Sequence, residues 1–209
     1  MSYHPLVLDL KTPPVVESFV RRHLDMQFND LHCMLRLPLY EFGLDAGCNF
    51  AAANSLLAFV SGLSVLLTNN LSASGQSENL FKKILLNYYP WDLQLPESSL
   101  IERCIDHLYD YFRNPLAHSL GIRTKGNFLV TIAKNSLAEA AIERLEQIQS
   151  SPGPAVSYTP IRLNGENIEQ ITLEVANFYW GVRGIVRRLS ADAQQMLRAE
   201  RDLKSLGWI

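Results

Sequence analysis

The sequence has few cysteines, and none of them is placed to form a recognisable framework. Cys33, Cys48 and Cys104 are far apart in the chain and lie in apolar stretches. An odd count without close spacing predicts neither a disulfide scaffold nor a zinc site, and it favours a reducing, cytoplasmic compartment. The N-terminus also lacks a basic region followed by an apolar core, so we expect no secretory signal.

Several motifs that carry chemistry in other proteins are missing from this sequence. It contains no glycine-rich phosphate-binding loop, no Glu-x-x-His metal motif and no Gly-x-Ser-x-Gly elbow. The sequence therefore does not support a P-loop ATPase, a di-iron bundle or an α/β-hydrolase. We expect no cofactor and no bound metal.

The net charge is small, and one long stretch has no charged residue. The formal net charge is −2, which argues against a protein that coats nucleic acid through its overall charge. No charged residue occurs from Ala46 to Ser77. Residues 46–68 are long enough to span a bilayer, but Asn49 and Asn54 dilute the apolar run and no Lys or Arg flanks it. We therefore expect a buried helix here and no membrane span.

The length of 209 residues suits a single domain, because a chain of this size buries roughly 70% of its unfolded surface. Helical periodicity predominates over residues 12–122 and again over 166–206. Thr12, followed by two prolines, predicts the start of the first helix, and Pro38 predicts its end. Residues 5–10 form a short apolar run that could be an edge strand.

Residues 127–163 have a different pattern. Residues 128–132 are rich in β-formers and predict a strand, whereas Ser136 and Glu139 form a capping box that predicts a helix as far as residue 149. Residues 156–163 predict a second strand, which Pro160 restricts to a sheet edge. The predicted fold is mainly α, an antiparallel helical bundle with a small β element of two or three short strands.

The C-terminal region carries a regular apolar repeat with alternating spacings of three and four. It comprises Ile168, Ile171, Val175, Phe178, Val182, Ile185 and Leu189. This 3.5-residue repeat predicts a long helix, either in the core of the domain or at the seam of a homodimer. Ser190 is a candidate N-cap for a last helix that ends near residue 206.

A second face of the same predicted helix carries Trp180, Arg183 and Arg187. An aromatic side chain among arginines suits the stacking and phosphate contacts of RNA binding. An ordinary surface face has the same pattern, so both interpretations stay open.

The stretch with the clearest chemistry follows an apolar-periodic helix that begins near Ser99. The predicted buried face of that helix comprises Ile101, Cys104, Ile105, Leu108 and Phe112. Asn114 and Pro115 then predict a break, with Asn114 capping a second short helix. In one straight helix Arg113 and His118 would lie about 140° apart. A change of direction at the break would instead let the two side chains converge beside the free N–H groups of the second helix. Such an arrangement could bind a phosphodiester.

The alternative for these two residues is structural. Arg113 could form an ion pair with Glu102, Asp106 or Asp110, and His118 could be a packed histidine with no role in catalysis.

The sequence Arg113-Asn114-Pro-Leu-Ala-His118 resembles the motif of the HEPN superfamily. The resemblance covers these six residues and the preceding helix. It implies an antiparallel helical bundle and, in many members, a metal-independent endoribonuclease whose site forms across a homodimer. Some members are toxins silenced by a nucleotidyltransferase-like antitoxin partner, and others are inactive binding modules.

The resemblance implies a role for each residue of the motif. His118 would transfer protons, because histidine has an ordinary pKa near 6.5, while Arg113 would stabilise phosphorane charge and Asn114 would orient the site. Arg123 and Lys125, in the polar loop that follows, are candidate RNA contacts. Two functions therefore remain open, an endoribonuclease and a non-enzymatic binding or regulatory protein of the same fold.

Overall fold

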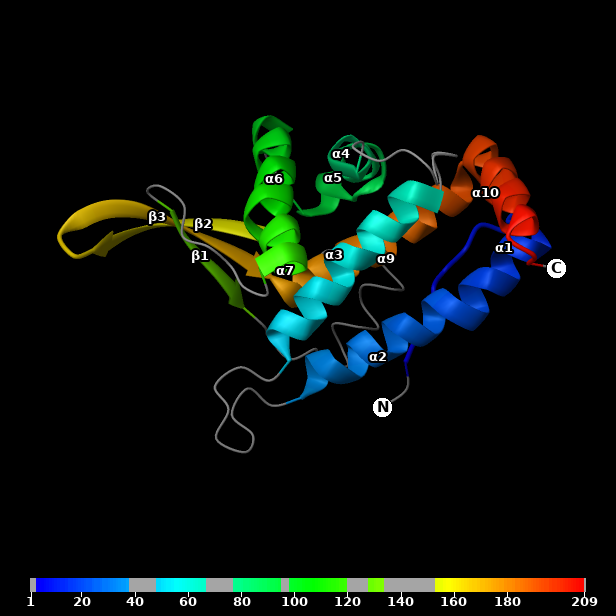
Figure 1. The fold of residues 1–209 in the computed structure, drawn as a ribbon, viewed down its shortest axis with the longest axis horizontal. Coiled ribbons are helices and arrows are strands. Elements are labelled where there is room, and N and C mark those ends of the chain that lie inside the picture. The colour runs from blue at the N-terminus through cyan, green and yellow to red at the C-terminus, as the bar shows by residue number, and fades with distance from the viewer. Residues whose placement is uncertain are drawn as a thin grey trace.

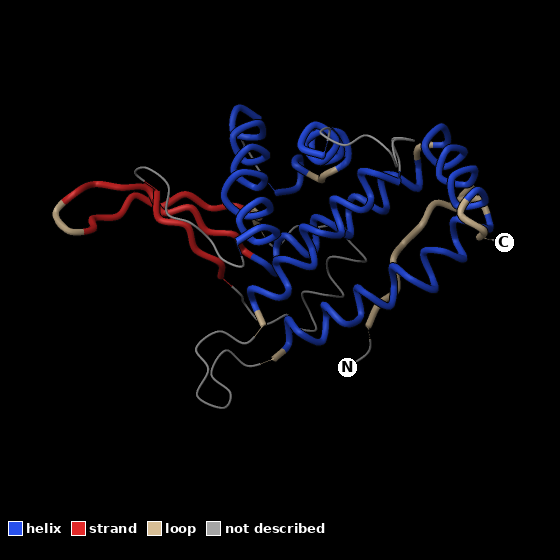
Figure 2. Tube along the Cα trace, viewed as in Figure 1, coloured by secondary structure: helices blue, strands red, loops and turns tan. Residues whose placement is uncertain are grey.

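The computed structural model describes residues 3–37, 48–66, 77–94, 98–119, 128–133 and 153–208. Helices make up most of this part of the chain (Figure 1). A small sheet of three strands lies at one end of the helical body, and its hairpin projects away from it (Figure 2). The expectation of a mainly helical fold with a small β element is confirmed.

The helical segments are α1 (Pro14–Phe19), the π-helical η1 (Val20–Leu24), α2 (Asp25–Arg36), α3 (Asn49–Leu66), α4 (Ser77–Tyr88), α5 (Trp91–Gln94), the 3-10 turn η2 (Ser98–Leu100), α6 (Ile101–His107), the π-helical η3 (Leu108–Arg113), α7 (Asn114–Ser119), α9 (Val175–Ala191) and α10 (Ala193–Ser205). The strands are β1 (Phe128–Ala133), β2 (Val156–Leu163) and β3 (Glu166–Glu174).

The central helix of the body is α9. It contacts α3, α4, α10 and β3, and it buries residues around nearly its whole circumference. The apolar repeat from Val175 to Leu189 is therefore part of the core of this chain. This burial decides between the two interpretations of the repeat in favour of a core helix.

Within the charge-free stretch, Asn49–Leu66 form α3, as expected, but only one face of this helix is buried. Its exposed face carries the small side chains of Ala51, Ser55 and Ala58, together with Gly62. The burial expected for residues 46–68 is therefore only partly correct, because α9 occupies the centre of the body instead. Among the helices described, none is long and apolar enough to cross a membrane.

The sheet has the strand order β1-β3-β2, with β3 parallel to β1 and antiparallel to β2. Ile171 in β3 lies opposite Val130 on one side and Tyr158 on the other. Pro160 lies on the edge strand β2, as expected, opposite Glu169 of the central strand.

The sequence-based prediction for residues 166–174 is wrong. We expected the first part of a long helix, but this segment is the central strand β3, and the helix begins only at Val175. Ile168 and Ile171 fit the heptad spacing, which a short strand rich in β-branched residues can match by coincidence.

Two continuous helices, α1–η1–α2 and α6–η3–α7, each contain a π-helical turn, and the spacing of their buried residues explains it. Each has three successive spacings of four, at Val16, Val20, Leu24 and Phe28 in the first helix and at Cys104, Leu108, Phe112 and Leu116 in the second. In a regular α-helix each such spacing drifts by about 40°, so three would rotate the stripe by about 120°. A wider turn with i→i+5 bonds keeps the stripe on one face.

The helix break predicted at Asn114 and Pro115 is absent, so that prediction is wrong. Asn114 has helical dihedrals (φ −68°, ψ −48°), and its N–H donates to the carbonyl of Tyr109, five residues earlier. In an α-helix the ring of Pro115 would collide with the carbonyl of Tyr111. The wider π turn gives the ring room, so the helix continues through it.

Several predicted helix caps also differ. Asp192, not Ser190, caps the last helix and accepts the N–H groups of Gln194 and Gln195, each at 3.1 Å. The hydroxyl of Thr12 donates to the carbonyl of Asp9 and caps no helix, and residues 5–10 are extended but belong to no strand. The helix predicted at residues 136–149 lies outside the described residues, as do Pro38, Arg123 and Lys125.

Candidate nucleic-acid site

The HEPN-like motif lies on η3 and α7, where the second continuous helix packs against α3 (Figure 1). Arg113 is the last residue of η3 and is half-buried. Asn114 and His118 belong to α7 and are exposed. The motif therefore occupies the end of a helix that the core holds in place through Phe112 and Leu116.

Arg113 contacts uncharged groups of its own helix and of α3. Its Nε donates to Ser61 Oγ at 3.5 Å, and its guanidinium lies 5.3 Å from the centre of the Tyr109 ring. Asp106 instead binds Lys82, with Nζ and Oδ1 2.8 Å apart. Across the part of the chain that the structure describes, no carboxylate forms an ion pair with Arg113. The alternative in which Arg113 serves a structural ion pair is therefore wrong.

The relative placement of the motif residues follows from the continuous helix. Asn114 and His118 are four residues apart, so their side chains lie about 40° apart on the same exposed face. Arg113 lies about 140° from His118. The convergence that a helix break would have produced is therefore absent, and one chain presents Arg113 and His118 as two half-sites.

The predicted RNA-binding face on the C-terminal helix is not a surface. Trp180 is 4% exposed and Arg183 is 5% exposed, so neither can stack on a base or contact a phosphate from outside. Arg187 is half-buried. The pattern misled because α9 is central, so that even the face that carries its arginines is covered by other parts of the chain.

A polar cluster that the sequence did not reveal joins α6 to the sheet. The Tyr158 hydroxyl lies 3.4 Å from Cys104 Sγ and 3.2 Å from His107 Nδ1. The guanidinium of Arg103 lies 4.4 Å from the centre of the Tyr158 ring and forms an ion pair with Glu169. In this cluster, the residues of α6 lie more than fifty positions from their partners in the sheet. No local sequence pattern therefore predicts the cluster.

The protonation states in this cluster argue against nucleophilic catalysis. Burial raises the pKa of the Cys104 thiol, so the protonated and less reactive form is favoured. Burial and the neighbouring Arg103 lower the pKa of His107, which favours the neutral imidazole. The cluster therefore fixes the sheet against α6 through neutral hydrogen-bonding groups and through the ion pair of Arg103 with Glu169.

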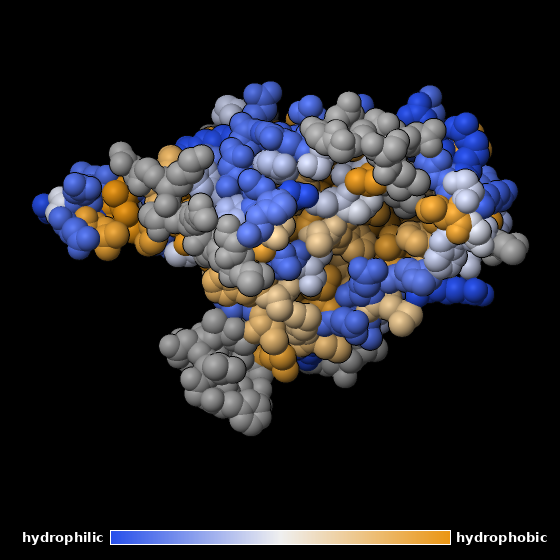
Figure 3. Space-filling view, viewed as in Figure 1, coloured by the Kyte–Doolittle hydropathy of each residue, from blue (hydrophilic) through white to orange (hydrophobic). Residues whose placement is uncertain are grey.

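An apolar groove of about 690 Å³ separates the first continuous helix from α3. In the space-filling view the hollow between these helices is lined by hydrophobic residues (Figure 3). Its lining comprises Phe19, Leu24, Gln27, Ser55, Ala58, Phe59, Ser61, Gly62, Leu63 and Val65, none of which is charged. Within the described ranges, no group of three or more His, Cys, Asp or Glu residues could hold a metal ion.

No protein-family model matches this sequence, and neither the curated proteins nor the solved structures contain a match to it. The interpretation of the site therefore depends on its geometry and on the six-residue motif.

Proposed function

We propose that this chain is a HEPN-like, metal-independent endoribonuclease of the cytoplasm, whose active site combines Arg113 of one copy with Asn114 and His118 of another. One observation carries the proposal, namely that the half-buried guanidinium of Arg113 has no carboxylate partner among the described residues. Removing part of the water from a cation without pairing it with an anion destabilises the folded state. An RNA phosphate would supply the missing negative charge.

The chemistry needs no external reactant. The RNA 2′-hydroxyl loses its proton to His118 and attacks the adjacent phosphorus, and the bond from phosphorus to the 5′-oxygen breaks. The leaving 5′-oxygen takes up the proton that His118 accepted, so the products are a 2′,3′-cyclic phosphate and a 5′-hydroxyl and His118 is neutral again. Arg113 stabilises charge on the non-bridging oxygens of the phosphorane, and Asn114 orients the phosphate.

A second copy is part of the proposal because the two half-sites diverge within one helix. A two-fold axis beside α7 would place Arg113 of one chain against His118 of the other and create two identical composite sites. It would also concentrate positive charge locally, although the chain as a whole carries a net charge of −2.

The first test measures cleavage of unstructured RNA in the presence of EDTA, together with the chemistry of the product ends. We expect His118→Ala and Arg113→Ala each to lower the rate by roughly 10²–10⁴-fold. The double variant should lose little more, because the two residues act as a unit. Arg22→Ala, at an exposed arginine on η1, serves as the matched control and should cleave like the wild type.

The second test asks whether the site is shared between chains. When Arg113→Ala and His118→Ala chains are mixed and allowed to exchange, each heterodimer retains one intact composite site. About one quarter of all sites should then become active. Cleavage by the wild type without any recovery in the mixture would refute the composite site.

The second candidate function is a non-enzymatic binding or regulatory protein of the same fold. It is favoured by the wide angle between Arg113 and His118 and by the uncharged groove beside α3. A nucleotidyltransferase-like antitoxin is a candidate partner, because the HEPN resemblance implies one for some members. The absence of EDTA-resistant cleavage from a pure, folded protein would favour this function.

A further inference from the structure

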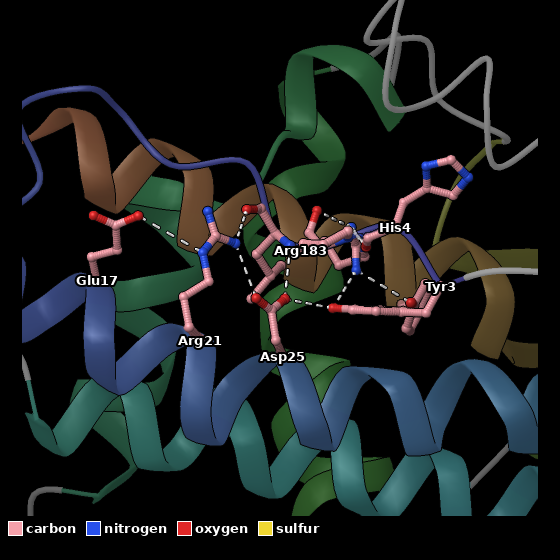
Figure 4. Close-up of polar contacts among 9 residues, drawn as sticks. Tyr3, His4, Glu17, Arg21, Asp25 and Arg183 are labelled. Carbon is pink, nitrogen blue, oxygen red and sulfur yellow. Dashed lines mark hydrogen bonds and ion pairs between the residues drawn. The ribbon is translucent and has the colours of Figure 1, made fainter.

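Residues 3–9, here called the arm, lie extended across the body between α2 and α9 (Figure 4). No strand pairs with the arm in the described part of the chain, and side chains of the body hold its backbone instead. Arg183 Nη2 donates to the carbonyls of His4 at 2.8 Å and Pro5 at 3.3 Å. Ser190 Oγ accepts the N–H of Asp9 at 2.9 Å. The body therefore binds the arm as it would bind a peptide ligand.

Leu6 is the residue of the arm that the body contacts most completely. Its N–H donates to Asp25 Oδ1 at 2.7 Å, and its carbonyl accepts from Arg21 Nη1 at 2.8 Å. Arg21 and Asp25 also form an ion pair at 3.0 Å, so each orients the other toward the arm. The side chain of Leu6 is 2% exposed and is therefore an apolar anchor.

Tyr3 links the two charges buried beneath the arm. Its hydroxyl donates to Asp25 at 2.7 Å and accepts from Arg183 at 3.0 Å. Asp25 is 8% exposed and Arg183 is 5% exposed. Without the arm, Asp25 would keep Arg21 and Arg183 would keep Tyr179, but both would lose the Tyr3 hydroxyl. A segment with a tyrosine followed three residues later by a leucine supplies that hydroxyl together with the apolar anchor.

The connection between the arm and α1 has the properties of a hinge. Leu10 is fully exposed, at 103%, and Lys11 is exposed as well. The closed turn depends on Asp9, whose carbonyl accepts the N–H of Thr12 at 3.1 Å and whose carboxylate accepts the N–H of Lys11 at 2.9 Å. Pro13 is extended (φ −57°, ψ 141°), and Pro14 begins α1.

We propose that the arm is exchangeable, so that the groove between α2 and α9 binds residues 3–9 of a second copy of this chain. Each hydrogen bond named above between the arm and the body involves a side chain of the body, so all of them transfer unchanged to an identical arm. Only the hinge between residues 9 and 13 changes, and exchange of such an element is a low-cost route to a dimer. The proposal goes beyond the nuclease function and does not depend on it.

The balance between the closed and the exchanged form depends on concentration and on the hinge. A short linker gives the chain's own arm an effective concentration of about 1 mM, so the closed form predominates in dilute solution. Deletion of Leu10 and Lys11 removes the residues that reverse the chain. We expect this variant to be exchanged even at micromolar concentration.

The test places a photocrosslinking residue at Val7, which is on the docked arm and 48% exposed. In the full chain at micromolar concentration, we expect crosslinks within one chain, with crosslinked dimers increasing at higher concentration. With residues 10 and 11 deleted, crosslinked dimers should predominate on a denaturing gel. This readout concerns the arm alone, so a dimer formed through α7 neither mimics nor hides it.

Two controls make the result decisive. Replacement of Leu10 and Lys11 by two glycines keeps the hinge at its full length and should restore crosslinks within one chain. Leu6→Asp removes the apolar anchor and should abolish crosslinking in both hinge backgrounds. Circular dichroism establishes that each variant is folded. The proposal is overturned if the folded, shortened-hinge variant crosslinks only within its own chain or fails to crosslink at all.

Discussion

A single methyl group added at Gly181 should destabilise this protein more than most surface substitutions do. Gly181 belongs to α9, and a Cβ built there would overlap the hydroxyl and ring atoms of Tyr89. The Tyr89 ring is 1% exposed, packs against Trp91, and donates its hydroxyl to Gln94 Oε1 at 2.5 Å. The ring therefore has no space to move into without losing that hydrogen bond.

The magnitude for Gly181→Ala follows from three opposing contributions. Replacing glycine by alanine inside a helix gains about 0.5–1 kcal/mol. Overpacking a dense core costs about 1–3 kcal/mol, and the buried amide of Gln94 left without its partner costs about 1–3 kcal/mol more. We expect a net loss of about 1–5 kcal/mol, or a fall in Tm of roughly 2–20 °C for a domain of this size.

Urea unfolding followed by circular dichroism measures this loss, and Gly62→Ala provides the matched control. Gly62 lies on the exposed face of α3, and a methyl group added there would meet no atom within 4 Å, so alanine should stabilise by about 0.5–1 kcal/mol. Tyr89→Ala combined with Gly181→Ala should cost less than the sum of the two single changes. Unchanged stability in Gly181→Ala, or full additivity of the pair, would refute this account of the packing.

Two further predictions concern stability. Burial, followed by the charges of Arg36 and Arg183, lowers the pKa of His32. The unfolded state then binds a proton more readily than the folded state. The stability that depends on neutral His32 is therefore fully present above the unfolded pKa of about 6.5, and it is lost progressively as the pH falls below that value. Urea midpoints at pH 7.5 and 5.5 measure that slope, which His32→Gln should reduce. Asp192→Ala should cost about 1 kcal/mol through loss of the α10 cap, whereas Asp192→Asn should retain most of it in thermal unfolding.

The elements that sequence reasoning predicted well are those whose pattern is local. The strands β1 and β2 were predicted from the residues within each segment, and packing then reinforces that local preference. The strand β3 could not be separated from the helix that follows it, because Ile168 and Ile171, three residues apart, continue the helical repeat and do not show the even spacing of one strand face. A heptad over so few residues does not distinguish a strand from a helix.

The candidate site was predictable as a motif but not as a geometry. Asn114 and Pro115 have the preferences of a helix break, and the π turn that accommodates the proline depends on packing around Phe112. Arg183 was misjudged for a different reason. Its partners are the arm and the rings of Tyr3 and Tyr179, and the arm is about 180 residues away in the chain. No spacing along one helix reveals such a contact.

The π turns also determine where this chain can change its length. A π turn is equivalent to one residue inserted into an α-helix, so deletion of one residue within Val20–Leu24 would leave a regular helix with both flanking stripes still facing the core. The same deletion elsewhere in α2 would rotate all later residues by about 100° and expose the core face. Deletion within Leu108–Arg113 would instead force the ring of Pro115 into the narrower turn. We therefore expect related sequences to vary in length within α1–η1–α2. Within α6–η3–α7 we expect such variation only where the proline is lost as well.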